Sequence, residues 1–329
     1  MRAFVTGATG FIGGAVVRRL LEAGHEVRAL VLPGCDTRQV DGLAIERIDG
    51  DVRDEDSVRR GIVGCDWVLH LAAIYSFRGH PWEDFQEVNI EGTQRVLQVA
   101  LDEGVKRVVH TSSVITVGVN DDRSLANEET PSTLADMYGH YARSKFLSEE
   151  VARDFARQGL PVVIVNPTSP MGEGDYRPTP TGRIIVDYLN GRMPAYVNTG
   201  INIVDVQDVA AGHLLAAERG RVGERYILGG DNLTLKEFLD ILSEVAGLPP
   251  VRIQVPTAVV KAWSYVDAAI GRVIPRYTPW ATPEEARQSD KWMHFDVSKA
   301  INELGLPQTL AREILRKAVA WYRANGYAP

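Results

Sequence analysis

Residues 6–13 read TGATGFIG, with glycines at positions 7, 10 and 13. The stretch follows a short apolar run and opens a helical pattern. Gly7 would permit a tight turn, Gly10 would let the backbone approach a pyrophosphate, and Gly13 would let the helix pack closely on the strand. The stretch therefore predicts a turn that binds a dinucleotide at a helix N-terminus. Its predicted contact residues are Gly7, Thr9, Gly10, Phe11, Ile12 and Gly13.

Outward from this turn, short apolar runs alternate with longer helical patterns through the first half of the chain. The predicted strands cover residues 3–6, 26–32, 67–71, 107–111 and 162–165. The predicted helices cover residues 13–23, 55–63, 85–103 and 138–158, and the glycines that can end them are Gly24, Gly64, Gly104 and Gly159. Strands that are apolar on both faces are typical of a parallel sheet covered by helices on each side. The pattern predicts a doubly wound α/β fold.

The regular alternation of predicted strands and helices ends after Pro167. Residues 168–183 are rich in Pro, Gly and Thr, which is typical of a long loop that forms a substrate site. We predict a dinucleotide-binding domain over residues 1–166, to which residues 196–232 partly return. A smaller, mostly helical substrate-binding lobe would cover residues 167–329. This lobe would close over the carboxyl edge of the sheet, where open α/β sheets bind ligands.

Composition excludes several classes of protein. The 329 residues are 45% hydrophobic and 24% charged, with a net charge of −7, which indicates a globular protein and argues against a nucleic-acid partner. Cys35 and Cys65 lack the spacing of a metal site or a disulfide framework, so we predict no metal and a reducing, cytoplasmic location. The first strand begins without a charged leader in this sequence, so we expect a protein that is not secreted.

The most apolar late segment covers residues 257–274 and carries Lys261, Asp267 and Arg272. No apolar run approaches the ~18 residues needed to span a bilayer. The segment is predicted to be an amphipathic helix packed on its own protein. Peripheral contact with a membrane surface is the alternative.

The end of the second strand chooses between the two nicotinamide cofactors. An acid there holds the ribose 2′-hydroxyl of NAD, whereas an Arg accommodates the 2′-phosphate of NADP. Leu32 stands at the strand tip, with Asp36 and Arg38 just beyond it. Because the acid at the tip is missing, the sequence favours NADP over NAD, with Arg38 as the phosphate contact. Asp36 as a contact of the ribose hydroxyl of NAD is the alternative. The next two strand ends would contact the adenine and the ribose through Asp51, Val52, Leu71, Ala72 and Ala73.

Tyr141 and Lys145 are four residues apart in a helical pattern, so they share one face of the helix. A phenol has a pKa of ~10 and catalyses poorly near neutrality, but a nearby ammonium favours the phenolate. The preceding strand ends at Thr111, Ser112 and Ser113, where a hydroxyl can bind the oxygen that Tyr141 protonates. This set predicts carbonyl reduction or alcohol oxidation, in which Lys145 also holds the nicotinamide ribose.

Together these motifs resemble those of the extended short-chain dehydrogenase/reductases, in the NAD-dependent epimerase/dehydratase family. The motifs are TGATGFIG (6–13), DV (51–52), HLAA (70–73), VNIEGT (88–93), TSS (111–113), YARSK (141–145) and NPTSPMG (166–172). The chain is most similar to dihydroflavonol-4-reductase-like proteins and to the hopanoid-associated sugar epimerase group. That similarity also involves VDVQDVAAGHLLA (204–216) and FDVSKAINELG (295–305).

The resemblance implies a Rossmann domain and further roles. Asn89 would support a hydrogen-bond network on the cofactor side, and Pro167 would pack on the nicotinamide. Thr111 and Ser112 would contact the cofactor, and Ser113 is the serine aligned with the catalytic one, although Ser112 is the alternative. A homodimer would form through the helices at 85–103 and 138–158.

The chain also departs from the family pattern. Sugar-nucleotide epimerases often carry an Arg and an aromatic residue where residues 200–206 read GINIVDV. A pocket for an apolar small-molecule substrate is predicted from Tyr75, Phe77, Trp82 and Met171. The leading hypothesis is hydride transfer at a carbonyl, alcohol or sugar carbon, as a reductase or an epimerase. A non-catalytic nucleotide-binding regulator is the alternative.

Overall fold

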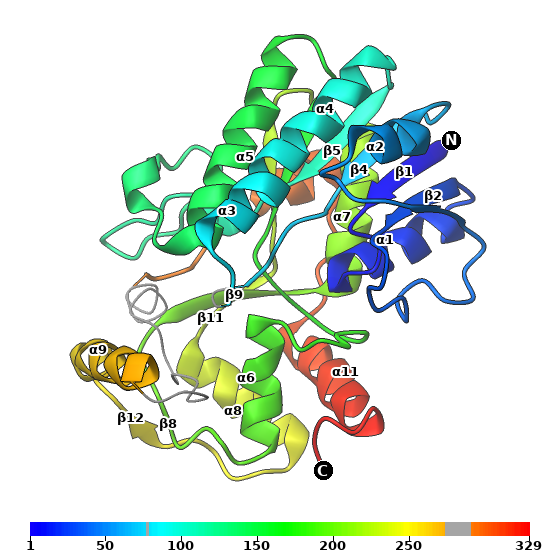
Figure 1. Cartoon of the computed structure of the whole chain (residues 1–329). Helices are drawn as coiled ribbons and strands as arrows, with labels where there is room; N and C mark the ends of the chain where they lie inside the picture. The colour runs from blue at the N-terminus through cyan, green and yellow to red at the C-terminus, as the bar shows by residue number, and fades with distance from the viewer. Residues whose placement is uncertain (77–78, 274–290) are drawn as a thin grey trace.

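The computed structural model describes residues 1–76, 79–273 and 291–329 (Figure 1). A parallel sheet of seven strands forms its centre, in the order β10-β6-β5-β4-β1-β2-β3. Its strands are β1 (Arg2–Thr6), β2 (Glu26–Val31), β3 (Glu46–Asp49), β4 (Trp67–His70), β5 (Arg107–Thr111), β6 (Val162–Pro167) and β10 (Arg225–Leu228). Every strand pairing in this sheet is parallel. The strands predicted from sequence are confirmed to within two residues.

Helices cover both faces of the sheet (Figure 1). α1 (Phe11–Glu22) and α7 (Val206–Arg219) share one buried apolar cluster with it, to which β1 contributes Val5. α2 (Glu55–Ile62), α4 (Gly92–Asp102) and α5 (Gly139–Arg157) share the other, to which the same strand contributes Phe4. Successive side chains of a strand point to opposite faces, which is why the runs are apolar throughout. The structure confirms the doubly wound fold.

The helix predicted at residues 85–103 is divided in the structure. It consists of α3 (Trp82–Phe85), a π-helical segment η1 (Gln86–Glu91) and α4. The wider turns of η1 bring the side chain of Asn89 into the core, where it is 1% exposed. A local departure from α-helical winding depends on such tertiary contacts and leaves no mark in the apolar pattern. The four glycines predicted to end helices all have positive φ values.

The C-terminal elements gather below the carboxyl edge of the sheet in Figure 1. A second sheet has the order β11-β9-β7, from β7 (Ser169–Met171), β9 (Gly200–Asp205) and β11 (Asp231–Thr234). A third apolar cluster joins α6 (Pro180–Leu189), α8 (Leu235–Ala246) and α11 (Ala311–Ala324). The remaining elements are β8 (Ala195–Tyr196), β12 (Ile253–Gln254), α9 (Thr257–Val273) and the short helices η2 (Val114–Thr116), η3 (Leu134–Asp136) and η4 (Ala300–Leu304).

Residues 196–232 serve both parts of the fold. β10 and α7 belong to the central sheet and its cover, whereas β9 and β11 belong to the second sheet. The chain therefore crosses between the two parts more than once. The division into residues 1–166 and 167–329 stays a prediction.

The structure has the helix predicted for residues 257–274, as α9. Its polar Ser264 and Asp267 are fully buried, whereas Trp263 and Val266 are about half exposed. At these four positions the buried side of the helix carries polar groups and the exposed side carries apolar ones. Ile274 and the side chain of Arg272 lie outside the described residues. Among the helices that the structure describes, none has the length and apolar character to cross a membrane.

Candidate active site

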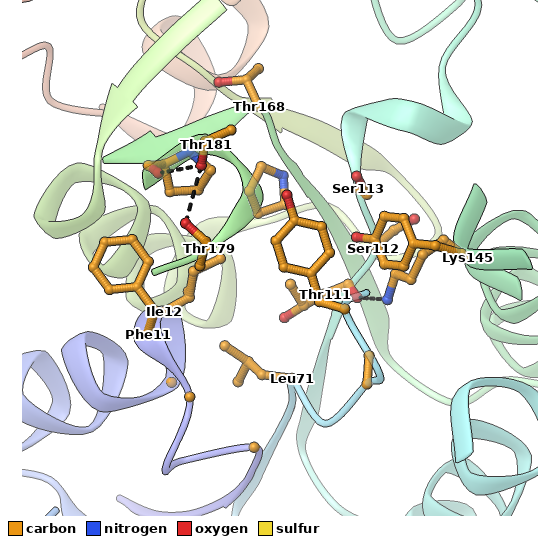
Figure 2. A pocket seen from close by; sticks show the side chains of 18 residues that line it. Phe11, Ile12, Leu71, Thr111, Ser112, Ser113, Lys145, Thr168, Thr179 and Thr181 are labelled. Carbon is orange, nitrogen blue, oxygen red and sulfur yellow. Dashed lines mark hydrogen bonds between the residues drawn. The ribbon is translucent and has the colours of Figure 1, made fainter. Parts of the chain in front are cut away.

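A cavity opens at the carboxyl ends of the central strands (Figure 2). It brings together the glycine turn, the ends of β4, β5 and β6, and the first turns of α5. Its lining residues are Gly7, Gly10, Phe11, Ile12, Gly13, Leu71, Ala73, Tyr75, Thr111, Ser112, Ser113, Tyr141, Lys145, Pro167, Thr168, Pro170, Thr179 and Thr181. Most residues predicted for cofactor and catalysis therefore lie in one cavity.

The glycine turn is built by close backbone approach. A Cβ atom on Gly13 would lie 2.0 Å from the carbonyl oxygen of Gly7, so no side chain fits there. Gly7 has a φ of +71°, and a Cβ on it would lie 2.7 Å from the amide nitrogen of Ala72. Gly10 differs, because it is exposed and its Cβ would meet a single atom at 3.2 Å. No side chain caps the N-terminus of α1 at Gly10, which leaves the first amides of the helix open to an anion.

Lys145 is buried in the cavity wall. Its Nζ donates a hydrogen bond of 2.6 Å to the carbonyl oxygen of Thr111, as Figure 2 shows. Burial lowers the pKa of Lys145 to about 8, although the charge of Glu149 acts in the opposite direction. The ammonium is therefore close to its titration point at physiological pH.

Tyr141 is buried beside Tyr75, with 4.9 Å between the ring centroids. Burial raises the pKa of Tyr141 to about 12, and the hydrogen bond with the side chain of Ser113 lowers it only in part. The sequence argument, that Lys145 lowers this pKa, is wrong for the structure as described, because burial outweighs the favourable contacts. The phenol is therefore neutral and able to donate a proton.

The two serines after β5 have different partners. Ser112 Oγ donates a hydrogen bond of 2.5 Å to Glu149 Oε2, deep behind the cavity. Ser113 Oγ accepts from the amide of Ile115 at 3.3 Å, and its side chain contacts Tyr141. The side chain of Thr111 turns away to His213. Of the three hydroxyls, that of Ser113 is the one paired with the phenol.

Asn89 lies behind the cavity rather than in its wall. Its Oδ1 accepts from the amide of Ile74 at 2.7 Å, and its Nδ2 donates to Ser144 Oγ at 2.9 Å. It thus ties the loop after β4 to α5. The role in a cofactor-side network that the resemblance implies stays a prediction.

Five other predicted contacts are not among the residues that line the cavity. Arg38 pairs with Asp36 at 2.6 Å, and its guanidinium lies 4.6 Å from the ring centroid of Tyr176. Asp51 pairs with Arg53 at 2.7 Å. The other three are Thr9, Val52 and Ala72. A nucleotide extends beyond one cavity, so these positions stay predictions for the parts of the nucleotide outside it.

The predicted aromatic pocket is found only in part. Tyr75 lines the cavity. Met171 is 1% exposed and belongs to the apolar core of the C-terminal part, while Trp82 contacts His140 and Arg143 instead. Met171 is the last residue of the short strand β7, whose burial is set by long-range packing. Phe77 lies outside the described residues.

Sequence reasoning missed four residues of the wall, namely Thr168, Pro170, Thr179 and Thr181. Thr179 Oγ1 donates to Asp175 Oδ2 at 2.9 Å. Thr181 Oγ1 donates to the carbonyl oxygen of Pro170 at 3.3 Å, as Figure 2 shows. They come from the loop that was predicted to form the substrate site, and its many Thr residues were the available signal. Within residues 1–76, 79–273 and 291–329, no three His, Cys, Asp or Glu side chains are placed to hold a metal ion.

Comparison with known proteins agrees with this geometry. The model of the NAD dependent epimerase/dehydratase family matches residues 3–229. A Synechocystis protein named "Putative dihydroflavonol 4-reductase" is 41% identical, covering 98% of this chain and 95% of its own length. Sterol demethylase protein B of Methylococcus capsulatus is 38% identical, covering 99% of both chains. The crystal structure of gox2253 superposes with a TM-score of 0.89 at 39% identity, covering 99% of both chains.

A Rossmann-type sheet with this cavity at its carboxyl edge defines a nicotinamide-dependent enzyme. The chain belongs to the NAD dependent epimerase/dehydratase family. The glycine turn fits such a cofactor, because it leaves uncapped amides and an exposed Gly10 where a pyrophosphate would sit.

Proposed function

We propose that this enzyme transfers a hydride at a carbonyl, alcohol or sugar carbon of a small molecule, with Ser113, Tyr141 and Lys145 as the catalytic residues. One observation carries the proposal. The paired hydroxyls of Ser113 and Tyr141, the Lys145 ammonium and the glycine turn all face one cavity.

Each residue has a distinct part in the proposed reaction. The nicotinamide, when bound, supplies or accepts the hydride. The Ser113 hydroxyl donates a hydrogen bond to the substrate oxygen, and the neutral Tyr141 phenol gives that oxygen its proton during reduction. With the cofactor bound, the Lys145 ammonium would donate hydrogen bonds to the ribose hydroxyls. Pro167 would pack against the nicotinamide, and Gly7, Gly10 and Gly13 would hold the pyrophosphate.

The surroundings of Tyr141 favour a substrate that is apolar around the reacting carbon. Tyr75 and Pro170 supply an apolar wall, next to Leu71 and Pro167, which would contact the cofactor. The relative Sterol demethylase protein B bears the name of a lipid-modifying protein, which supports the same class. We therefore propose a carbonyl reductase, with a hopanoid-associated sugar epimerase as the alternative. Steady loss of nicotinamide absorbance with substrate indicates a reductase, and its absence during substrate conversion indicates an epimerase.

Lys145→Ala should weaken cofactor binding by about tenfold or more, since a charge-assisted hydrogen bond is lost. In the wild type, affinity should be steady below neutral pH and fall as pH rises through about 8, where the ammonium loses its proton. Fluorescence titration of nicotinamide binding across this range measures both effects. Lys236→Ala, on α8 and outside the cavity, is the control. The role of Lys145 in cofactor binding is contradicted if the wild-type affinity does not change with pH, or if Lys145→Ala binds the cofactor as tightly as the wild type.

We propose NADP as the cofactor, because the charged side chains that gather beyond β2 carry a net positive charge. They are Asp36, Arg38 and Arg177. Asp36 already accepts hydrogen bonds from Arg38, and Arg177 lies 3.8 Å away from it. Arg38→Ala should weaken NADP affinity by about fivefold or more and leave NAD affinity within about twofold, because only NADP has the phosphate. Titration with both cofactors tests this, with Arg19→Ala as control. Equal losses for NAD and NADP contradict the assignment.

We further propose a cytoplasmic homodimer, built on the adjacent outer helices α4 and α5 (Figure 1). Cys35 and Cys65 are both free thiols, which suits a reducing compartment. Light scattering at micromolar concentration should give about twice the chain mass of 36.2 kDa. The mass of a single chain would contradict the dimer.

A further inference from the structure

Glu149 lies one helical turn after Lys145 on α5 and is 2% exposed. It does not line the cavity, and the proposed reaction gives it no part. A buried carboxylate is costly unless it is paired and hydrogen-bonded, so its partners decide what it does.

One oxygen of Glu149 faces the segment that carries Ser113. Oε2 accepts from Ser112 Oγ at 2.5 Å and from Asn166 Nδ2 at 2.9 Å. Thr116 Oγ1 lies 2.7 Å from this oxygen and 2.7 Å from the Ser113 carbonyl oxygen, so its single proton is shared between the two acceptors. Asn166 Nδ2 also donates to that carbonyl oxygen, at 3.0 Å. Glu149 is therefore linked to the Ser113 backbone through two side chains.

The other oxygen faces two arginines. Oε1 accepts from Arg153 of α5 at 2.8 Å and from Arg225 of β10 at 3.2 Å. Arg225, together with the hydrogen bonds from Ser112 and Thr116, holds the pKa of Glu149 below its usual range despite burial. Glu149 therefore stays negatively charged, whereas a proton relay would have to gain and lose a proton.

The same charge acts on Lys145. Glu149 is the carboxylate that raises the pKa of Lys145 against its burial. Burial lowers the pKa of His70 of β4 and of His110 of β5, and the Lys145 charge lowers both further. Both imidazoles are therefore neutral. Tyr141 shares the helix face and is neutral as well.

We propose that Glu149 is a positioning residue of this site, which anchors the turn carrying Ser113 to α5 and keeps Lys145 charged. The inference rests on the proposed function, because it assigns a task to the support of Ser113 and Lys145. Carboxylate geometry serves the first task, and carboxylate charge serves the second.

The test is Glu149→Gln, which keeps the shape and removes the charge. The matched control is Glu150→Gln, the exposed neighbour that also pairs with Arg153. In Glu149→Gln, amide exchange of residues 112–116 should be at least about tenfold faster than in the wild type. The pH midpoint of cofactor affinity should fall by about one unit, because an opposite charge near Lys145 is lost. Glu150→Gln should match the wild type in both measurements.

Two further variants separate geometry from charge. Glu149→Asp keeps the charge and should keep the wild-type pH midpoint, which a merely structural role would not require. Thr116→Val removes one donor and leaves the charge, so it should speed exchange of residues 112–116 without moving the midpoint. These variants also serve if Glu149→Gln does not fold.

The proposal is overturned if Glu149→Gln keeps either the wild-type exchange or the wild-type midpoint, or if Glu150→Gln changes as much. It is also overturned if Thr116→Val exchanges like the wild type, or if Glu149→Asp shifts the midpoint. A wild type that binds no nicotinamide cofactor would instead contradict the proposed function, and the exchange measurements would still decide whether Glu149 anchors the turn.

Discussion

Tyr141→Phe should lower kcat by at least about 100-fold, because general acid–base catalysis is worth that much or more. The ring and its contact with Tyr75 remain, whereas the proton that moves to the substrate oxygen is lost. Cofactor affinity should stay within about twofold, since ground-state contacts are kept. Stopped-flow or steady-state assays on a screened substrate, beside a binding titration, measure the two quantities.

Tyr138→Phe is the matched control, since Tyr138 is 37% exposed and immediately precedes α5. It should keep kcat within about twofold, because it does not line the cavity with Ser113. If Tyr141→Phe retains more than about a tenth of the wild-type rate, where far less is expected, another group donates the proton.

Gly10→Val should weaken cofactor binding by at least about tenfold, or about 1.4 kcal/mol, with little change in stability. Gly10 is exposed, and its Cβ would meet one atom, the Gly7 carbonyl oxygen at 3.2 Å, so the turn must shift by only a few tenths of an ångström to admit a side chain. The added methyl groups would instead occupy the place of the pyrophosphate at the start of α1. Calorimetric titration and thermal unfolding test the two parts.

Gly13→Ala is the comparison that separates binding from folding. Its Cβ would lie 2.0 Å from the Gly7 carbonyl oxygen, so the turn must distort. We expect its Tm to fall by about 5 °C or more, against about 2 °C or less for Gly10→Val. Wild-type affinity in Gly10→Val would contradict the phosphate site.

The sheet and the glycine turn were predictable because their determinants are local. Apolar runs such as residues 107–111 are short and continuous, which indicates buried strands. A glycine follows the end of each predicted helix between them. Tyr141 and Lys145 are on one helix, so their spacing alone places them together. The place of Ser113 in the site could be predicted from its position after a strand, since parallel strands end at the same edge of the sheet.

The features of the site that could not be predicted from the sequence depend on long-range packing. Thr179 and Thr181 reach the cavity because a loop of the C-terminal part folds back over the sheet edge. Met171 belongs to the core of that part, which a Pro-rich segment does not indicate. Glu149 acts through Asn166 and Arg225, far along the chain, so its acidic side chain resembled any surface residue of a helix.

The pKa of Tyr141 shows the same limit in electrostatic terms. Spacing predicts that the Lys145 ammonium lowers it, but spacing carries no measure of burial. In the structure the ammonium donates to the Thr111 carbonyl oxygen, and burial raises the Tyr141 pKa to about 12.

A crystal structure of the protein with NADPH tests the central claim most directly. We predict the pyrophosphate against Gly10, the nicotinamide beside Pro167 and Tyr141, and the Lys145 ammonium within hydrogen-bond distance of the ribose. A nicotinamide outside this cavity, with Lys145 still bonded to the Thr111 carbonyl oxygen, would contradict the claim that these residues transfer the hydride and the proton.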